Sequence, residues 1–524
     1  MPAAGAGVAV RPGQARAWGG AALAGVLYFL GYLGYGAWPC LLIFLVPLWA
    51  SLEHASTGRS AAGIGLVFGL TAFAGGFLWL WPLVDAFLGG NRLFGGVLWV
   101  GYGAWFAVEF VAYALVFHAM RRRGWSMTAA GVAPLVAIEW LQPQMFPLYA
   151  GGGLVAVLPL VQVADLGGPL LLTALLGAAN VAAYETWTWR QGARTRPLAV
   201  WTIALLLSMV VLVYGRVRIA AIDATVAATS ALRVGIVQAN LSRLEKEVQS
   251  LVAHRRHLEQ TRELLAGGAV DLVVWPETAY VRGIRRPLPL SGHPIVEDVS
   301  VPLLFGAASV RDDDGQLVKA NSVFLVGADG MIRSVYDKNL LIPLSEYVPL
   351  REAVPAIARW FPDVQDFTAA DDTPAVELGS WRIVTPICYE AIRPEFVRRM
   401  VRASNPHLVI TLANDAWFGD SQEPWLHLGL ARLRAVEHRR FVVRATNSGI
   451  SAIVDPVGRI VVRSGVLTRE NVRGTVRMLE GETVYARFGD WPGIIAAAVV
   501  ILALCFRPRP SLVRPPTAPR DRAG

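Results

Sequence analysis

The chain has 524 residues, of which 54% are hydrophobic and 17% charged, and its formal net charge is +9. This composition is too apolar for a single soluble protein, whereas the second half carries too many charges for a wholly membranous one. The positive charge argues against nucleic-acid binding, because the arginines cluster beside apolar segments, as at 121–123, where basic residues set membrane topology.

The first half of the chain alternates apolar blocks with short loops, and a helix that crosses a bilayer needs about 20 apolar residues. After a cytoplasmic N-terminus at 1–16, we therefore expect a polytopic helical membrane domain of about seven helices at 17–215. An eighth span at 491–506 precedes a basic cytoplasmic tail at 507–524. The first seven spans are expected at 17–36, 38–54, 61–82, 93–120, 126–142, 165–188 and 197–214.

The loops between these spans predict how the protein is oriented. Basic residues precede the first span and follow the second, fourth and sixth, whereas the other loops carry almost none. These basic residues are Arg11, Arg16, Arg59, the arginines at 121–123, Arg190, Arg194 and Arg196. Because short cytoplasmic loops are rich in arginine and lysine, the N-terminus is placed inside. After seven spans the polar domain lies outside, and the eighth span returns the tail to the cytoplasm.

The polar part begins after a predicted linker at 216–231 and extends over 232–485. Strand-like runs alternate there with helix-like stretches, which are clearest at 244–265 and 424–440. This alternation predicts an α/β domain with sheets covered by helices, and catalytic groups are expected at the carboxyl ends of strands. The strand-like runs are 232–238, 270–275, 302–310, 322–326, 382–388, 407–412, 440–446, 451–454 and 460–463.

Three polar residues follow strand-like runs in this domain: Glu277, Lys338 and Cys388. Cys388 is the only cysteine of the polar domain, because Cys40 and Cys505 lie in apolar spans. An unpaired thiol in an oxidising compartment is a liability unless the chemistry requires it. Cys388 is therefore the candidate nucleophile.

A glutamate, a lysine and a cysteine together can perform acyl transfer through a thioester. The free thiol has a pKa of about 8.5, so it needs a base near neutral pH. A carboxylate can accept the proton, and an ammonium group can stabilise the thiolate and then the oxyanion. Taken singly, each residue has a commoner explanation, as a solvated surface glutamate, a solvated lysine or a small buried core cysteine.

The residues around these three groups resemble a known superfamily. The carbon–nitrogen hydrolase (nitrilase) superfamily carries Glu, Lys and Cys in this order, and the membrane spans narrow the resemblance to the apolipoprotein N-acyltransferase family over about residues 15–506. The matching motifs are Trp275-Pro276-Glu277, Asp337-Lys338, Ile387-Cys388-Tyr389-Glu390 and the stretches 344–349, 414–420 and 444–449.

The resemblance implies a nitrilase-like, four-layer αββα sandwich on the periplasmic side of the cell inner membrane. It also implies a ping-pong reaction in which an acyl chain passes from a phospholipid, typically phosphatidylethanolamine, to the N-terminal S-diacylglyceryl-cysteine of a diacylated apolipoprotein. No cofactor is expected. The eight histidines show no metal-ligand spacing, so no metal site is expected either. Nothing in the sequence requires more than a monomer.

The resemblance also assigns roles to individual residues. Glu277 acts as general base, and Lys338 stabilises the oxyanion together with the backbone N–H of Tyr389. Glu346 and Glu390 resemble supporting carboxylates. The candidate substrate-binding residues are Tyr347, Asn414, Trp417 and Phe418.

Two other functions use the same residues or the same topology. A membrane-tethered amidase keeps the triad and lets water resolve the thioester, but seven preceding spans are excessive for an anchor. A scaffold that binds lipoproteins without catalysis does not require an intact triad. One departure from the family is visible, because the loop at 238–246 lacks the tryptophan of the lysine–tryptophan pair that commonly shapes the entrance.

Overall fold

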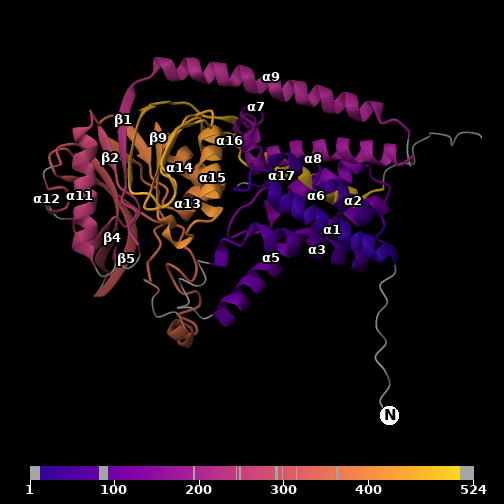
Figure 1. Ribbon diagram of the computed structural model, residues 1–524, viewed down its shortest axis with the longest axis horizontal. Helices are drawn as coiled ribbons and strands as arrows, with labels where there is room; N and C mark the ends of the chain where they lie inside the picture. The colour runs from indigo at the N-terminus through magenta and orange to yellow at the C-terminus, as the bar shows by residue number, and fades with distance from the viewer. Residues whose placement is uncertain are drawn as a thin grey trace, which may run out of the picture.

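The computed structural model describes residues 12–32, 34–81, 92–192, 195–242, 245–246, 249–288, 293–297, 299–313, 315–360, 364 and 366–507. The predicted cytoplasmic termini therefore lie mostly outside the described residues, as do Arg11 and Arg194. A helical part and a part built on two sheets lie side by side in Figure 1, with the long helix α9 running along both. The predicted fold class, a helical membrane domain joined to a nitrilase-like α/β sandwich, is confirmed.

The helical part contains helices of very different lengths. By length and composition, three segments of the described residues could cross a membrane: Gly95–Arg122, Ala164–Arg190 and Leu198–Ala228. The helical elements are α1 Pro12–Gly31, η1 Trp38–Leu42, α2 Leu45–Glu53, α3 Gly58–Gly76, α5 Arg92–Arg122, α6 Met127–Leu141, η2 Ala150–Ala156, α7 Leu158–Val161, α8 Ala164–Arg190, α9 Leu198–Ala228 and α17 Trp491–Cys505.

The structure differs from the sequence-based expectation in two of these segments. The predicted span at 38–54 is divided into η1 and α2. The predicted linker at 216–231 is mostly the second half of α9, which continues to Ala228. The change from apolar to charged composition suggested a boundary there, but charge does not end a helix, and no proline interrupts this segment.

The α/β part is a sandwich of two sheets. The first sheet has the order β13-β1-β2-β4-β5-β6 with β3 paired to β4, and the second has the order β12-β11-β10-β9-β8-β7. The strands are β1 Ala231–Gln238, β2 Leu272–Val274, β3 Tyr280–Arg285, β4 Leu303–Asp313, β5 Gln316–Val326, β6 Ile332–Asp337, β7 Val376–Leu378, β8 Trp381–Val384, β9 Leu408–Ala413, β10 Phe441–Thr446, β11 Ala452–Val454, β12 Ile460–Arg463 and β13 Glu470–Arg477.

Helices cover the outer face of each sheet and complete the four layers. Side chains from both sheets, such as Ile236 and Ile410, share one buried core between them. Helix α11 (Ser250–Ala266) packs on the first sheet, and α14 (Pro394–Ser404) with α15 (Glu423–His438) lies on the second sheet (Figure 1). Strands β1, β2 and β4 run parallel, as do β8, β9 and β10. Their carboxyl ends therefore meet at common edges, where side chains can gather.

A buried carboxylate joins the two parts of the molecule. Arg439, which follows α15, donates to Asp165 Oδ2 at 2.8 Å and to Gln162 Oε1 at 2.6 Å. Asp165 lies in the first turn of α8, and Gln162 lies just before it. Asp165 also accepts from Tyr214 and Arg218 of α9, at 2.6 and 2.8 Å. One carboxylate thus connects α8, α9 and the α/β part.

The same junction depends on close packing at a bend in α8. Gly167 and Gly168 have non-helical backbone angles, and Gly168 has φ 63° and ψ −159°. A Cβ at Gly168 would lie 2.4 Å from the ring of Tyr485, so only glycine allows α8 to contact the segment before α17. The bend therefore brings the α/β part against the helical part.

We predict that Arg439→Met destabilises the protein by about 3 kcal/mol, because it removes the guanidinium partner of a buried carboxylate. The measurement is the unfolding midpoint in detergent. Arg459→Met is the matched control: Arg459 pairs with Asp223 of α9 at 2.7 Å, but the two side chains are 40% and 46% exposed. This control should change stability by less than about 1 kcal/mol. Equal effects of the two substitutions would contradict the prediction.

Candidate active site

Glu277 is placed by a short, fully buried strand. β2 ends at Val274, and Trp275 and Pro276 carry the chain to Glu277. The backbone N–H of Gly306 on β4 donates to the carbonyl of Pro276 at 3.2 Å. A Cβ at Gly306 would lie 2.7 Å from the Cα of Glu277, so glycine permits this approach. The glutamate is 6% exposed and points into the domain interior.

Lys338 lies between two carboxylates. Its Nζ is 2.8 Å from Glu346 Oε1 and 3.4 Å from Glu277 Oε1, and its side chain is 1% exposed. The side-chain amide of Asn321 on β5 donates to the same two oxygens, at 2.9 and 2.7 Å. Burial opposes the ammonium form, but Glu346, Glu277 and Cys388 outweigh it and raise the pKa of Lys338 above its ordinary value. The lysine is therefore charged and oriented.

Glu390 connects the lysine loop to the cysteine turn. Its Oε1 accepts from the backbone N–H groups of Asn339 and Leu340, at 2.6 and 3.0 Å. Its Oε2 accepts from Ile387 N and from the hydroxyl of Tyr336, both at 2.8 Å. Burial raises the pKa of Glu390 to about 7, although the backbone N–H groups and Lys338 favour its carboxylate. One side chain thus fixes the residues that flank both Lys338 and Cys388.

Cys388 stands at the turn between β8 and the short helix α13 (Tyr389–Ile392). It has φ 48° and ψ −108°, a strained backbone conformation for a residue other than glycine. Its N–H donates to Leu412 O at 2.8 Å, which holds the turn against β9. A sharp strand-to-helix turn of this kind presents a nucleophile away from its own backbone.

The environment of Cys388 disfavours its thiolate. Burial raises the pKa of the thiol well above its ordinary value, and the nearby carboxylates of Glu277, Asp415 and Glu346 add to the effect. Only Lys338 opposes this shift. Because little free thiolate exists at neutral pH, a base must accept the proton as the thiol reacts.

A small cavity of about 30 Å³, with apolar walls from both parts of the molecule, lies at Cys388. Phe418 and Tyr389 of the catalytic domain line it, and the ring centroid of Trp79 lies 5.4 Å from that of Phe418. His427 and Glu423 are the ionisable side chains along its wall besides Cys388 and Tyr389. The residues from the helical part are Trp79, Phe146 and Leu148.

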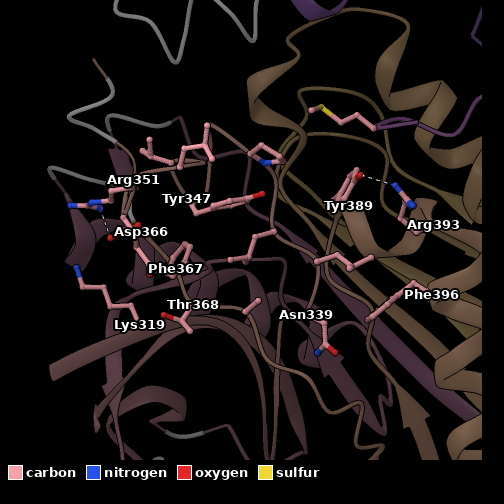
Figure 2. Close-up of a pocket in the computed structure, with 18 of the residues that line it drawn as sticks. Lys319, Asn339, Tyr347, Arg351, Asp366, Phe367, Thr368, Tyr389, Arg393 and Phe396 are labelled. Atoms are coloured by element: carbon pink, nitrogen blue, oxygen red, sulfur yellow. Dashed lines mark hydrogen bonds and ion pairs between the residues drawn. The ribbon is translucent and has the colours of Figure 1, made fainter. Parts of the chain in front are cut away.

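A larger cavity of about 1810 Å³ lies on the other side of Tyr389. Figure 2 shows Tyr347 and Tyr389 within it, with Arg351 and Lys319 on the side away from Tyr389. Arg393 Nη1 donates to the hydroxyl of Tyr389 at 3.0 Å. Its lining also contains acidic residues, and Arg351 is paired with Asp366 and Arg393 with Glu395, so the cavity combines ion pairs with apolar walls.

The structure distributes the four candidate substrate-binding residues over three cavities. Phe418 shares the apolar cavity with Cys388, and Tyr347 lines the large cavity. Asn414 and Trp417 line a third cavity of about 720 Å³, together with Thr278, next to Glu277. Asn414 also accepts from Asn447 Nδ2 at 3.2 Å. The sequence placed these four in one group, but they surround the Glu–Lys–Cys cluster from different sides.

Sequence reasoning missed two residues that contact the catalytic groups. Asn321 lies in the middle of β5, where no motif signals its role. Lys246, in the loop that lacks the family's tryptophan, directs Nζ to Glu277 O at 3.4 Å and to Thr278 Oγ1 at 3.3 Å. Burial lowers the pKa of Lys246 to about 8, against the attraction of Glu277. Its place directly after the first strand of the domain was the available signal.

A cluster of charged groups adjoins the apolar cavity. His427 Nδ1 is 3.3 Å from both Asp415 Oδ1 and Glu423 Oε1. Within the described part of the chain, these three form the one group whose donor atoms lie close enough to hold a metal ion. Asp415 Oδ2 is also 2.5 Å from Arg444 Nη2, so a guanidinium already balances this carboxylate. We interpret the cluster as an ion-pair network.

Comparisons with known proteins agree with this geometry. A family model for carbon-nitrogen hydrolases matches residues 233–478, and a model for the apolipoprotein N-acyltransferase N-terminal domain matches residues 24–182. The apolipoprotein N-acyltransferase of Geobacter metallireducens is 30% identical over 507 residues, which cover 93% of this chain and 95% of that protein. The corresponding protein of Pseudomonas aeruginosa is 28% identical over 511 residues, with 91% and 93% covered.

Among solved structures, part of the chain is similar to a protein of the nitrilase superfamily. Nit3 from Saccharomyces cerevisiae, a member of branch 10 of the nitrilase superfamily, is 17% identical and aligns with a TM-score of 0.38. The alignment covers 49% of this chain and 93% of that structure.

We predict that alkylation of Cys388 by iodoacetamide keeps accelerating as the pH rises through 9, because the raised pKa leaves the thiol protonated below that pH. The measurement is the rate in a Cys40→Ser, Cys505→Ser protein, where Cys388 is the only thiol. A small model thiol serves as the reference. Lys338→Met should slow the reaction at every pH, because it removes the ammonium that favours the thiolate. A rate plateau below pH 8 would contradict the prediction.

We predict that Glu390→Gln lowers the melting temperature and slows reaction at Cys388 at least about tenfold. Glutamine has one acceptor oxygen, so donors to the other position lose their partner, at about 1–3 kcal/mol for each buried group. The measurements are thermal unfolding and the rate at which iodoacetamide alkylates Cys388. Glu377→Gln on exposed β7 is the control and should leave both unchanged. Wild-type behaviour of Glu390→Gln would show that the four hydrogen bonds do not position the site.

Proposed function

The chain belongs to the apolipoprotein N-acyltransferase family, and from this premise we propose how it performs lipoprotein N-acylation. It is an acyltransferase, as the sequence predicted. In the proposed reaction, Cys388 takes an acyl chain from a membrane phospholipid, typically phosphatidylethanolamine. The enzyme then delivers the chain to the α-amino group of the N-terminal S-diacylglyceryl-cysteine of an apolipoprotein.

The observation that carries the proposal is the position of the Glu277–Lys338–Cys388 cluster beside an apolar cavity. Trp79, Phe146 and Leu148 of the helical part form one wall of this cavity, and the catalytic domain forms the other. At about 30 Å³ the cavity holds only one or two water molecules, so the apolar character of its walls, and not its volume, is what suits an acyl chain. Apolar walls that come partly from the helical part favour a lipid donor over the substrate of a soluble amidase.

In the first half-reaction, Glu277 accepts the thiol proton while the sulfur of Cys388 attacks the ester carbonyl carbon. The oxyanion that forms accepts hydrogen bonds from the Lys338 ammonium and from the backbone N–H of Tyr389. The C–O ester bond then breaks, and Glu277 returns the proton to the departing glycerol oxygen. The products are a thioester on Cys388 and a lysophospholipid, with all protons balanced.

In the second half-reaction, the neutral α-amine of the diacylglyceryl-cysteine attacks the thioester carbonyl. Glu277 accepts a proton from the nitrogen, and the same oxyanion groups serve again. The C–S bond breaks, and the sulfur of Cys388 recovers the proton. The amide product and the free enzyme result, so no cofactor or metal enters the sequence of steps.

The remaining predicted residues hold these groups or the substrates. Glu346 orients Lys338 at 2.8 Å, and Glu390 fixes the loops on either side of the nucleophile. Phe418 contacts the acyl chain, and Tyr347 faces the larger cavity. Asn414 and Trp417 border the third cavity, on the Thr278 side. We assign these four cavity-lining residues to substrate binding, each in the cavity that it lines.

We propose a multi-pass protein of the cell inner membrane with its catalytic domain, 232–485, in the periplasm. The basic loops after the second, fourth and sixth predicted spans support this orientation. Both substrates lie in the membrane, one as a phospholipid and the other through its diacylglyceryl group, and an enzyme fixed in the bilayer meets them by lateral diffusion. A monomer suffices, because Glu277, Lys338 and Cys388 all come from one chain.

We predict that intact mass spectrometry of the detergent-purified protein detects a gain of one acyl chain after incubation with phosphatidylethanolamine. Cys388→Ala should abolish the adduct, and Glu277→Gln should slow its formation at least about 100-fold, because general-base catalysis contributes that much or more. A diacylated lipopeptide should discharge the adduct and gain the same mass.

The same experiment separates the other functions. Discharge by water as fast as by lipopeptide indicates a membrane-tethered hydrolase. A folded protein that forms no adduct with any phospholipid indicates a lipoprotein-binding scaffold. N-acetylation of the lipopeptide is the control, because it blocks the amine and should leave the acyl-enzyme intact.

A further inference from the structure

A groove of about 1270 Å³ lies in the helical part, between α1, α2, α3 and the end of α8. Its wall is apolar and partly exposed; Leu23 is 52% exposed and Ile43 is 46% exposed. The apolar lining residues are Leu23, Leu27, Ile43, Val46, Ala50 and Ile64. An apolar groove of this volume on a membrane helix surface suits hydrocarbon chains.

The groove lies far from the Glu–Lys–Cys cluster. Trp79, which lines the cavity of Cys388, follows the C-terminal end of α3, whereas Arg59 at the other end lines the groove. The 19 residues of α3 separate these ends by about 27 Å, at 1.5 Å per residue. α8 repeats this arrangement, with Asp165 against the catalytic domain and Trp187 on the groove. Figure 1 shows the start of α1 at the end away from the sheets.

Basic side chains collect at one end of the groove. Arg16 in the first turns of α1, His54 after α2 and Arg59 at the start of α3 all line it, and its lining contains no aspartate or glutamate. Within the described residues, neither arginine forms an ion pair. The neighbouring Glu53 is bound to Arg121 at 2.6 Å and does not compensate them.

The other residues at this end suit the membrane–water boundary. Trp18 and Trp187 line the groove and are 41% and 39% exposed. Tryptophan is enriched at the headgroup level of membrane proteins, where its ring is apolar and its N–H remains hydrated. Ser56, Thr57 and Ser60, close to Arg59 in the sequence, also line the groove. The groove therefore has an apolar wall that suits acyl chains, tryptophans at the headgroup level, and a basic end that suits a phosphate.

We propose that this groove binds one anionic phospholipid, with its phosphate on Arg16 and Arg59 and an acyl chain along the apolar wall. A zwitterionic lipid brings an ammonium group among three basic side chains, so a lipid with net negative charge is favoured. The apolar wall selects a lipid over free phosphate. In the orientation given by the basic loops, this lipid belongs to the cytoplasmic leaflet and is distinct from the acyl donor at Cys388.

Native mass spectrometry of the full chain tests the proposal. The Cys388→Ala protein is used, so that no covalent acyl group is counted as bound lipid. It is titrated with phosphatidylglycerol or with phosphatidylethanolamine of the same acyl chains. We expect one phosphatidylglycerol to bind at least about tenfold more tightly than phosphatidylethanolamine. Arg16→Gln with Arg59→Gln should remove this preference.

The matched control is Arg122→Gln with Arg123→Gln. It removes the same charge from the same end of the helical part, but neither residue lines the groove. This control should keep the preference, and equal losses in the two double variants overturn the proposal. Equal affinity of the starting protein for the two lipids also overturns it.

Two further measurements separate the apolar contact and the fold. Leu23→Gln, at a half-exposed position of the wall, should weaken phosphatidylglycerol binding, and millimolar inorganic phosphate should not compete. Competition by phosphate at that concentration overturns the lipid assignment. In the protein with Cys388 present, Arg16→Gln with Arg59→Gln should still form the acyl adduct. This result shows that the variant is folded and keeps the groove separate from the proposed catalysis.

Discussion

The buried ammonium group of Lys338 is the constraint on which the active site depends. An isolated charge in a protein interior costs several kcal/mol, so it must be matched closely. Glu346 at 2.8 Å and Glu277 at 3.4 Å provide this match, and Asn321 binds the same carboxylate oxygens. The neighbouring thiol of Cys388 stays protonated until it reacts, because burial raises its pKa and the nearby carboxylates add to this effect, whereas Lys338 opposes it.

The sequence revealed the chemistry of this site better than its shape. Glu277, Lys338 and Cys388 each follow a strand, and strand ends in an α/β domain converge, so their meeting could be predicted. Asn321 could not be predicted, because an asparagine inside a strand is a residue type with many uses. The grouping of Asn414 and Trp417 with Phe418 was natural, since they are close in the chain. A turn at η4 (Asp415–Trp417) sends them to different cavities, and no local pattern indicates this.

For the fold too, features set by local sequence patterns could be predicted, whereas features set by contacts between distant segments could not. Hydrophobic runs and strand alternation predicted the two classes of domain, because both are local patterns. The continuation of α9 to Ala228 and the junction at Asp165 depend on contacts between distant segments. Arg439 and Asp165 are 274 positions apart, so neither residue alone indicates its partner. Burial of the pair becomes evident only when α8 and α15 are placed together.

The catalytic cluster and the junction at Asp165 both contribute to the apolar cavity. Trp79, Phe146 and Leu148 can form its wall only if the helical part keeps a fixed position relative to the turn of Cys388. The Arg439–Asp165 contact and the bend at Gly168 fix this position. A flexible connection between the two parts would not hold the three side chains next to Cys388. A chain that only anchored a soluble enzyme to a membrane would need neither contact. The helical part is therefore a component of the proposed acyl-binding site, and changes at the junction should affect the nucleophile's surroundings as well as stability.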